Sequence, residues 1–436
     1  MPFLFMLFGP YLVETLLWLI AMSVIAISVT RIYIDSALAI GTGKIKKLVL
    51  KADIGKKRKP FVTIMIPSYN EARVIDRVLE AATAIDYPRY EIIVADDSTE
   101  KSMAKRLEHW RRKGEIKVVH RSTRKGYKAG ALNNAMRYID PRCEYIAFFD
   151  ADYIPHKKVI WEMLSDFSQK RIAAVQGYTQ QSLNASKNFI TKSASLSLST
   201  YCLVEMAAKM KFGGFIPIFG SVFMVRREAL EDVNGFNESS ITEDWDLASK
   251  FTERGYEILF DERISVPAEC PTTFRVLLRQ QIRWAEGVTR DTKNHLMTMM
   301  TSTRVSLMKK LDYLFCGFSS FNGVMGSASY VLFAIVLLIN ARIIITLGVD
   351  RSLILGLGFF GQFMIFFVAP VYIPLAVIVS SLIALYRESK ISRFPWCIYL
   401  FFVGLTLAPF VAYGGLRGLL FKRGSWKRTP KTGEVE

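Results

Sequence analysis

Charged residues are almost absent from three long stretches of the chain and abundant between them, and this separation restricts the fold more than any other feature. Glu14 is the only charged residue among residues 1–30, and residues 352–386 and 394–416 carry none. A membrane-spanning helix needs about 20 mostly apolar residues. The pattern predicts an N-terminal membrane anchor, a charged globular region over roughly 41–312, and an apolar, membrane-embedded C-terminal region.

The chain is both basic and apolar. It has 57 Lys and Arg against 39 Asp and Glu, a formal net charge of +18, and 51% of its 436 residues are hydrophobic. A soluble nucleic-acid-binding protein would account for the charge but not for the apolar content. The same content excludes an intrinsically disordered chain. The five cysteines have no Cys-x-x-Cys spacing, so neither a zinc ribbon nor a disulfide framework is predicted. We expect an integral membrane protein that binds no nucleic acid.

Basic residues after the first apolar stretch indicate the membrane topology. Residues 1–40 are predicted to be an uncleaved anchor, and residues 41–60 a basic linker that keeps the following domain in the cytoplasm. The tail, residues 422–436, is also basic, which predicts a cytoplasmic C-terminus and an even number of C-terminal spans within residues 313–421, four or two. In the four-span layout the basic loop 387–393 lies outside, against the same rule.

Four short apolar runs in the globular region each end in polar residues. The runs cover residues 61–66, 90–95, 115–119 and 145–149, and helical patterns over 73–83 and 101–113 lie between them. Strand–helix alternation favours a mostly parallel, doubly wound α/β sheet. In such sheets ligands bind beyond the carboxyl ends of the strands, where these polar residues fall.

Acidic residues dominate the strand ends. Asp150 and Asp152 follow one run, and this spacing suits a hard divalent cation whose other positions bind phosphate oxygens; a solvated turn is the alternative. Asp96 and Asp97 follow another run. The basic, glycine-containing segment 124–130 suits a nucleoside diphosphate, because lysine supplies charge and glycine permits close approach of the backbone.

Two further segments each have a functional and a structural interpretation. Glu243 and Asp244 precede a predicted helix, either as favourable first-turn acids or as a carboxylate that accepts a proton from an attacking hydroxyl. Gln280, Arg283 and Trp284 lie in an amphipathic stretch, residues 273–288. They form either an ordinary interfacial helix or a surface that stacks on a sugar and binds its hydroxyls.

These motifs, in this order, resemble the D, D, D, QxxRW signature of the processive family 2 glycosyltransferases, and most of all the cellulose-synthase-like mannan and glucan synthases. The matching segments are Asp96-Asp-Ser-Thr, Gly126-Tyr-Lys-Ala-Gly, Asp150-Ala-Asp, Thr242-Glu-Asp and Gln280-Gln-Ile-Arg-Trp. The resemblance covers residues 60–310. It implies a GT-A fold, α/β and Rossmann-like, over residues 61–272, with interfacial helices over residues 273–312.

The resemblance also implies roles for individual residues. Those that would bind the nucleotide sugar are Pro67, Tyr69, Glu71, Asp96, Asp97, Lys128 and Asp150. Asp150 and Asp152 would hold Mg²⁺ or Mn²⁺. Asp244, with Glu243 beside it, would be the catalytic base. The acceptor would be held by Gly220, Ser221, Gln280, Arg283 and Trp284. In the tail, Trp426, Thr429 and Lys431 resemble a gating loop usually written FxVTxK, with Trp in place of Phe and Arg in place of Val.

The activity implied by the resemblance is inverting transfer of a hexose from a nucleotide sugar, UDP-glucose or GDP-mannose, to a growing β-linked polysaccharide, with secretion of the product as a further expectation. The alternative is a non-processive enzyme that glycosylates a lipid: ceramide, diacylglycerol or a polyprenyl phosphate. Membrane lipids are the other expected partners. We predict a plasma-membrane location, with the Golgi as the alternative. The sequence leaves the oligomeric state open.

Overall fold

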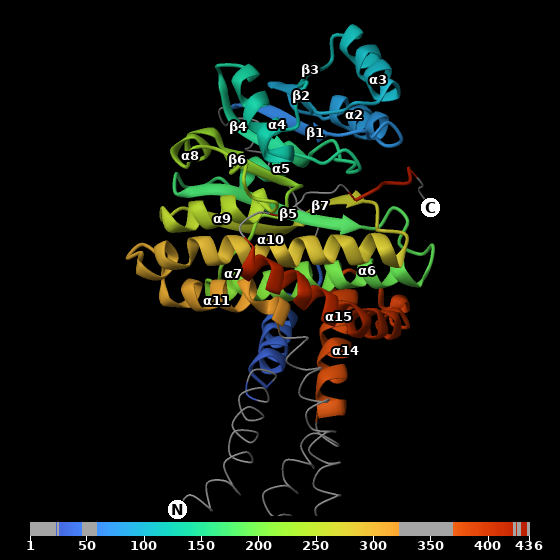
Figure 1. The fold of residues 1–436 in the computed structure, drawn as a ribbon, viewed down its shortest axis with the longest axis vertical. Coiled ribbons are helices and arrows are strands. Elements are labelled where there is room, and N and C mark those ends of the chain that lie inside the picture. The colour runs from blue at the N-terminus through green and yellow to red at the C-terminus, as the bar shows by residue number, and fades with distance from the viewer. Residues whose placement is uncertain are drawn as a thin grey trace, which may run out of the picture.

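The computed structural model describes residues 23, 26–45, 59–321, 369–421, 424 and 429–433. Its centre is a seven-stranded sheet with strand order β3-β2-β1-β4-β6-β5-β7 (Figure 1). The strands are β1 (Phe61–Ser68), β2 (Tyr90–Asp96), β3 (Lys117–His120), β4 (Cys143–Phe148), β5 (Ile172–Gln181), β6 (Phe223–Arg226) and β7 (Glu257–Ala268). The predicted α/β domain is confirmed, and its sheet is mixed because one strand, β6, runs antiparallel to its neighbours.

All four predicted strands are present as β1 to β4, and they run parallel to one another. Their side chains alternate between two cores: Ile64 and Ile92 pack on one face of the sheet, and Met65 and Ile93 pack on the other. This alternation follows from the pleat of a strand. Burial on both faces explains why the runs of β1, β2 and β4 are mostly apolar, whereas the edge strand β3 is largely exposed and contains Lys117 and His120.

Helices cover both faces of this sheet. One core contains side chains of α2 (Ile75–Thr83), α3 (Lys101–Arg112) and α5 (Val159–Ser165). The other contains side chains of α4 (Tyr127–Ala135), α8 (Arg227–Asp232) and α9 (Glu243–Glu253). Strand β6 was not predicted, and it runs antiparallel to both of its neighbours, β4 and β5. It joins the predicted parallel strands to the β5–β7 pair, which is also parallel.

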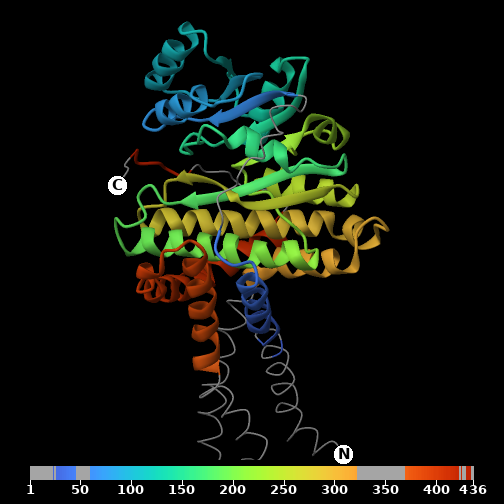
Figure 2. The ribbon, with the colours of Figure 1, turned by 180° about the vertical axis from the view of Figure 1, so that it is seen from behind.

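A layer of long helices lies along one side of the domain (Figures 1 and 2). It consists of α6 (Phe189–Thr200), a π-helical turn (Tyr201–Met206), α7 (Ala207–Phe212), α10 (Phe274–Thr301) and α11 (Leu307–Gly317). Helix α10 extends well past the predicted amphipathic stretch. The Thr273 side chain accepts a hydrogen bond from the Val276 amide and so caps its start.

Two C-terminal helices meet this layer differently. Helix α14 (Ala369–Arg387) runs away from it, whereas α15 (Trp396–Leu420) lies along α10 (Figures 1 and 2). A Cβ atom on Gly414 would lie 2.6 Å from the Ile282 carbonyl oxygen, so glycine permits the close approach of α15 and α10.

Among the described residues, α15 is the one helix of sufficient length and apolarity to span a membrane, and residues 374–387 form a shorter apolar helix. Most of the predicted N-terminal span and all of residues 322–368 lie outside the described residues.

Candidate active site

The carboxyl ends of β1, β2 and β4 open into a cavity of about 740 Å³ that continues to the helical layer. Because parallel strands end at the same edge of the sheet, polar residues distant in the sequence meet here. The predicted nucleotide-sugar residues that line the cavity are Pro67, Tyr69, Glu71, Asp97, Lys128 and Asp150. The Arg124 guanidinium lies over the Tyr69 ring, 3.4 Å from its centroid.

Lys128 lies at the centre of the acidic groups. Its Nζ donates to Asp150 Oδ1 at 2.7 Å and to the Gly220 carbonyl at 2.7 Å, and it lies 3.6 Å from Glu243 Oε1. Burial by itself would lower the pKa of Lys128, but Asp150 and Glu243 outweigh it and raise that pKa above the usual value. The side chain is therefore a fixed positive charge beside the acids, suited to a diphosphate.

Asp152 is buried and bound by the C-terminal tail. Lys431 Nζ donates to Asp152 Oδ2 at 2.5 Å. The backbone amides of Thr432 and Gly433 donate to the Glu269 carboxylate at 2.9 and 3.1 Å, and Arg77 pairs with the same carboxylate. Glu269 thus holds the tail so that Lys431 reaches Asp152.

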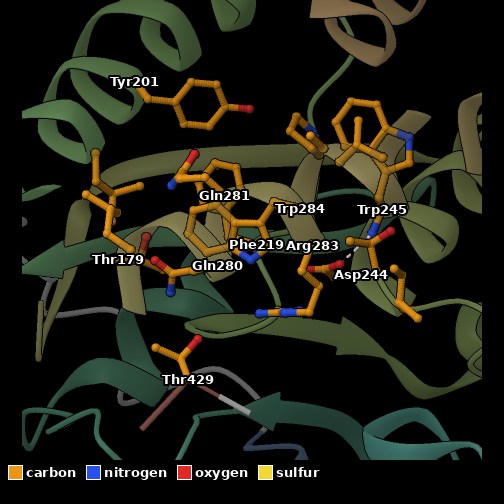
Figure 3. A pocket seen from close by; sticks show the side chains of 18 of the residues that line it. Thr179, Tyr201, Phe219, Asp244, Trp245, Gln280, Gln281, Arg283, Trp284 and Thr429 are labelled. Atoms are coloured by element: carbon orange, nitrogen blue, oxygen red, sulfur yellow. Dashed lines mark hydrogen bonds between the residues drawn. The ribbon is translucent and has the colours of Figure 1, made fainter. Parts of the chain in front are cut away.

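Asp244, in the first turn of α9, also lines the cavity (Figure 3). Burial and the neighbouring Glu243 raise the pKa of Asp244 above its usual range, against the opposing effect of Lys128 and Arg283. Gly220 has a φ of +78°, and a Cβ atom there would lie 2.8 Å from Asp244 Oδ2. Only glycine fits this position without strain.

Helix α10 brings the QxxRW residues to the same cavity. Gln280, Arg283 and Trp284 line it, as Figure 3 shows. Burial lowers the pKa of Arg283, although Glu243, Asp244 and Asp150 partly compensate. Trp284 is 36% exposed, so its indole presents an open face to a ligand.

Three predicted site residues are placed differently from the rest. Asp96 is buried at the end of β2, where it accepts hydrogen bonds from the Ser98 amide and contacts His120. Ser221 is buried behind the cavity wall, and its Oγ accepts a hydrogen bond from the Asp150 amide at 2.9 Å. Trp426 lies outside the described residues, whereas Thr429 and Lys431 line the cavity.

Sequence reasoning missed the residue that shapes the Phe219–Val222 turn. Gln176 on β5 is fully buried; its Nε2 donates to the carbonyls of Ser221 and Val222, and its Oε1 accepts from the Phe219 amide. It thereby fixes the backbone around Gly220. A single amide inside an apolar run was the available signal, because a buried polar group needs partners.

Arg121 and Glu269 were also missed as site residues. Arg121 forms a two-pronged ion pair with Asp97, at 2.7 and 2.6 Å, and so positions the acid that lines the cavity. Arg121 follows the run 115–119, and Glu269 opens the segment Glu269-Cys-Pro-Thr, which also resembles the family. Neither position revealed a role, since the partners of both residues lie far away in the sequence.

The described residues contain no cluster of three His, Cys, Asp or Glu side chains that could hold a metal ion. Asp150 and Asp152 nevertheless both line the cavity. Mg²⁺ is commonly held by one or two carboxylates together with substrate phosphates and water. The two acids therefore fit a divalent cation that binds with a diphosphate.

Comparison with known proteins agrees with this geometry. Residues 59–287 match the family described as "Glycosyltransferase like family 2". The chain is 32% identical over 275 residues to glucomannan 4-beta-mannosyltransferase 7 of Arabidopsis thaliana, a match that covers 61% of this chain and 49% of the relative. It is 29% identical over 271 residues to glucomannan 4-beta-mannosyltransferase 1 of Cyamopsis tetragonoloba, covering 60% of this chain and 51% of the relative.

The chain thus spans about half the length of these relatives. Among solved structures, a mannosyltransferase from Pyrobaculum calidifontis in complex with GDP-Man and Mn²⁺ superposes with a TM-score of 0.55 at 18% identity. The superposition covers 86% of this chain and 99% of that protein. At this identity the similarity concerns the fold.

Proposed function

The chain belongs to the family 2 glycosyltransferases, and from this premise we propose that it transfers a hexose, with inversion, from a nucleotide sugar to a growing β-linked polysaccharide. The observation that carries the proposal is one cavity lined by a buried acid, a fixed lysine, two candidate metal-binding acids and the QxxRW residues. The names of the relatives favour a mannosyl donor such as GDP-mannose over UDP-glucose.

Asp244 is the proposed base. An acceptor hydroxyl has a very high pKa and must lose its proton as it attacks, so one positioned carboxylate is required. The raised pKa of Asp244 suits this task, because a base works best when its pKa lies near the operating pH. Inversion in a single displacement needs one base and no covalent intermediate.

The leaving diphosphate requires positive charge. Lys128 supplies one charge, and Arg283 faces the same acidic cluster. Asp150 and Asp152 would hold a divalent cation, Mg²⁺ or Mn²⁺, whose chemistry when bound is to neutralise the diphosphate. Trp284 would stack on the acceptor sugar, and Gln280 would bind its hydroxyls.

A lipid acceptor is the second candidate, favoured by the wall that α15 contributes. The cavity-lining residues of this wall are all apolar: Leu400, Val403, Gly404, Leu407, Ala408 and Val411. Such a wall offers no side-chain hydrogen bonds to a polysaccharide and suits an acyl or polyprenyl chain. The predicted plasma-membrane location, its Golgi alternative, and the coupling to secretion stay predictions.

The test is to offer the purified full chain GDP-[¹⁴C]mannose or UDP-[¹⁴C]glucose with Mn²⁺ and to size the products. We expect label from GDP-mannose in a long polymer, and none with Asp244→Asn. Label that enters a single organic-extractable glycolipid would replace the first proposal by the second. No incorporation from either donor, in the presence of membrane lipids, would contradict both.

A further inference from the structure

The cavity continues beyond the residues proposed for catalysis. In Figure 3, Tyr201 lies on the far side of Gln281 and Trp284 from Thr429. Glu205, four residues after Tyr201, also lines the cavity. Neither residue has a role in the proposed transfer, and an acceptor that extends from Asp244 past Trp284 would reach this space.

The backbone that carries these two residues is irregular. Tyr201–Met206 form a π-helical turn between α6 and α7. Four of its six side chains are buried in the core, and the two partly exposed ones are Tyr201 and Glu205. A π-turn widens the helix and is frequent at functional sites. Here it directs a phenol and a carboxylate into the cavity.

The two side chains have the chemistry of a sugar-binding pair. The Tyr201 ring lies 5.5 Å from the Phe219 ring, centroid to centroid, which gives two aromatic surfaces for the C–H faces of a pyranose. The Tyr201 hydroxyl makes no hydrogen bond with any residue of the part of the chain that the structure describes. It is free to donate to a ligand.

The Glu205 carboxylate is paired with a lysine, yet one of its oxygens stays available to a ligand. Its Oε1 pairs with Lys209 Nζ at 2.9 Å, and the Lys209 side chain is fully buried. Lys209 Nζ also contacts Cys316 Sγ at 2.9 Å. The contacts of Glu205 with Lys209 and Cys316 both use Oε1, which leaves Oε2 for hydroxyl groups. Lys209 Nζ also lies 3.7 Å from Asp312 Oδ2, so its positive charge is shared between the two acids.

We propose that Tyr201 and Glu205 form a second acceptor subsite, which binds the hexose next to the one that receives the new sugar. The inference rests on the proposed transfer to a β-linked glycan and adds the residues that recognise its second unit. The α15 wall is apolar and offers this unit no side-chain hydrogen bonds, whereas the π-turn offers a hydroxyl and a carboxylate. The ligand class is a neutral hexose disaccharide or longer oligosaccharide.

The test measures binding of methyl β-mannoside and of β-1,4-mannobiose by calorimetry to full-length Asp244→Asn, which binds without turnover. We expect the disaccharide to bind more tightly than the monosaccharide. Adding Glu205→Gln or Tyr201→Phe should weaken disaccharide binding about five- to tenfold, because each variant removes one hydrogen bond, and should leave monosaccharide binding within about twofold. Tyr138→Phe, on the exposed surface, is the matched control.

Tyr201→Phe keeps the ring and the packing, so this variant tests the subsite even if Glu205→Gln fails to fold around Lys209. Equal losses for both sugars, no loss for either, or no gain from the second hexose would overturn the subsite. The wild-type transfer assay is a separate readout. If wild type extends acceptors but both variants bind the disaccharide normally, the subsite is overturned and the proposed function stands. If wild type transfers no hexose, the proposed function is overturned.

Discussion

Asp244 is a carboxylate whose environment matches the work proposed for it. Its pKa is raised to about 7, with burial as the largest cause and Glu243 as the second. A raised pKa means that the acid is protonated, and inactive as a base, at low pH. We expect the turnover rate to fall as the pH drops through about 7, in a pH series at saturating donor. An acid limb near the ordinary aspartate value, about 4, would contradict this role.

The variant Asp244→Asn distinguishes a catalytic base from a group that only binds substrate. Asp244→Asn keeps the shape but cannot accept a proton, so we expect a loss of turnover of at least about a hundredfold, in the range for general-base catalysis. Nucleotide-sugar affinity should change little. Calorimetric titration with the donor checks the second part, and Asp232→Asn, in α8 outside the cavity, serves as the control.

Lys431 forms an ion pair with Asp152, one of the two acids proposed to hold the metal. Because its ammonium lies 2.5 Å from Asp152, Lys431 competes with a cation for that acid. We expect Lys431→Ala to raise Mn²⁺ affinity in the absence of nucleotide, roughly tenfold if about 1.4 kcal/mol of competition is removed. Titration of free Mn²⁺ by electron paramagnetic resonance measures this.

The exposed lysine Lys105 on α3 provides the matched control, as Lys105→Ala. A weaker Mn²⁺ affinity in Lys431→Ala than in the control would show that Lys431 supports the metal site instead of competing for it. If Lys431 also reaches the diphosphate, the same variant should bind the nucleotide sugar less tightly, an effect of opposite sign.

For single residues, the sequence predicts the groups that line the cavity better than the groups that hold them in position. Asp97, Lys128, Asp150, Asp244 and Arg283 carry groups that a strand end or a motif reveals, and all line one cavity. The sequence did not show which residues their supporting partners hold. Gln176 holds a turn 43 residues away, and Glu269 holds an amide 163 residues away. Only the folded sheet brings such pairs together.

Among the elements, the contact between α9 and α10 links stability to pH. His295 of α10 contacts Asp246 at 3.0 Å and Glu253 at 2.9 Å, both on α9. Burial opposes its charge, but the two acids outweigh burial and raise the pKa of His295 from 6.5 to about 9. A raised pKa stabilises the fold fully below pH 6.5, and this stabilisation is lost as the pH rises through about 9.

We therefore expect His295→Gln to unfold at a lower temperature than wild type near pH 6, by an amount equivalent to at most about 3 kcal/mol. The difference should shrink above pH 9. Thermal unfolding of the detergent-solubilised protein at several pH values checks this. The exposed His109 on α3 gives the control, His109→Gln. A difference that stays constant from pH 6 to pH 10 would contradict the assignment.

The elements themselves were predicted where periodicity was strong. The runs that became β1, β2 and β4 can be recognised in the sequence because strands buried on both faces are mostly apolar. The four-residue strand β6 has no comparable pattern, and its antiparallel direction depends on the path of the chain after α7. The apolar composition of residues 394–416 is equally compatible with a span and with α15 as it lies here, so composition by itself could not place it.

For the whole molecule, the contacts of α14 and α15 bear on the number of membrane crossings. The Arg387 side chain, at the end of α14, is fully buried; it pairs with Glu262 of β7 and donates to the Gly43 carbonyl. Glu388 accepts a hydrogen bond from the Tyr178 hydroxyl. The loop that follows α14 is therefore attached to the catalytic domain.

Helix α15 is attached to the same domain at both ends. Near its start, Tyr399 packs on Phe189 of α6, and near its end Arg417 pairs with Glu286 of α10. A helix held to one domain at both ends cannot cross a bilayer. Its outward side chains are apolar, among them Ile398, Phe402, Leu405, Leu416 and Leu420. We expect α15 to lie in the plane of the membrane interface, an arrangement that fits the layout with two C-terminal spans better than the layout with four.

The two layouts place residues 387–393 on opposite sides of the membrane. We expect Ile391→Cys, at a half-exposed position of this loop, to react with an impermeant maleimide from the side that carries the catalytic domain. Tyr138→Cys on the catalytic domain marks that side, and the five native cysteines are all buried. Labelling in inverted and right-side-out vesicles compares the two positions. The same sidedness supports α15 at the interface, because a spanning α15 requires Ile391→Cys and Tyr138→Cys to react from opposite sides.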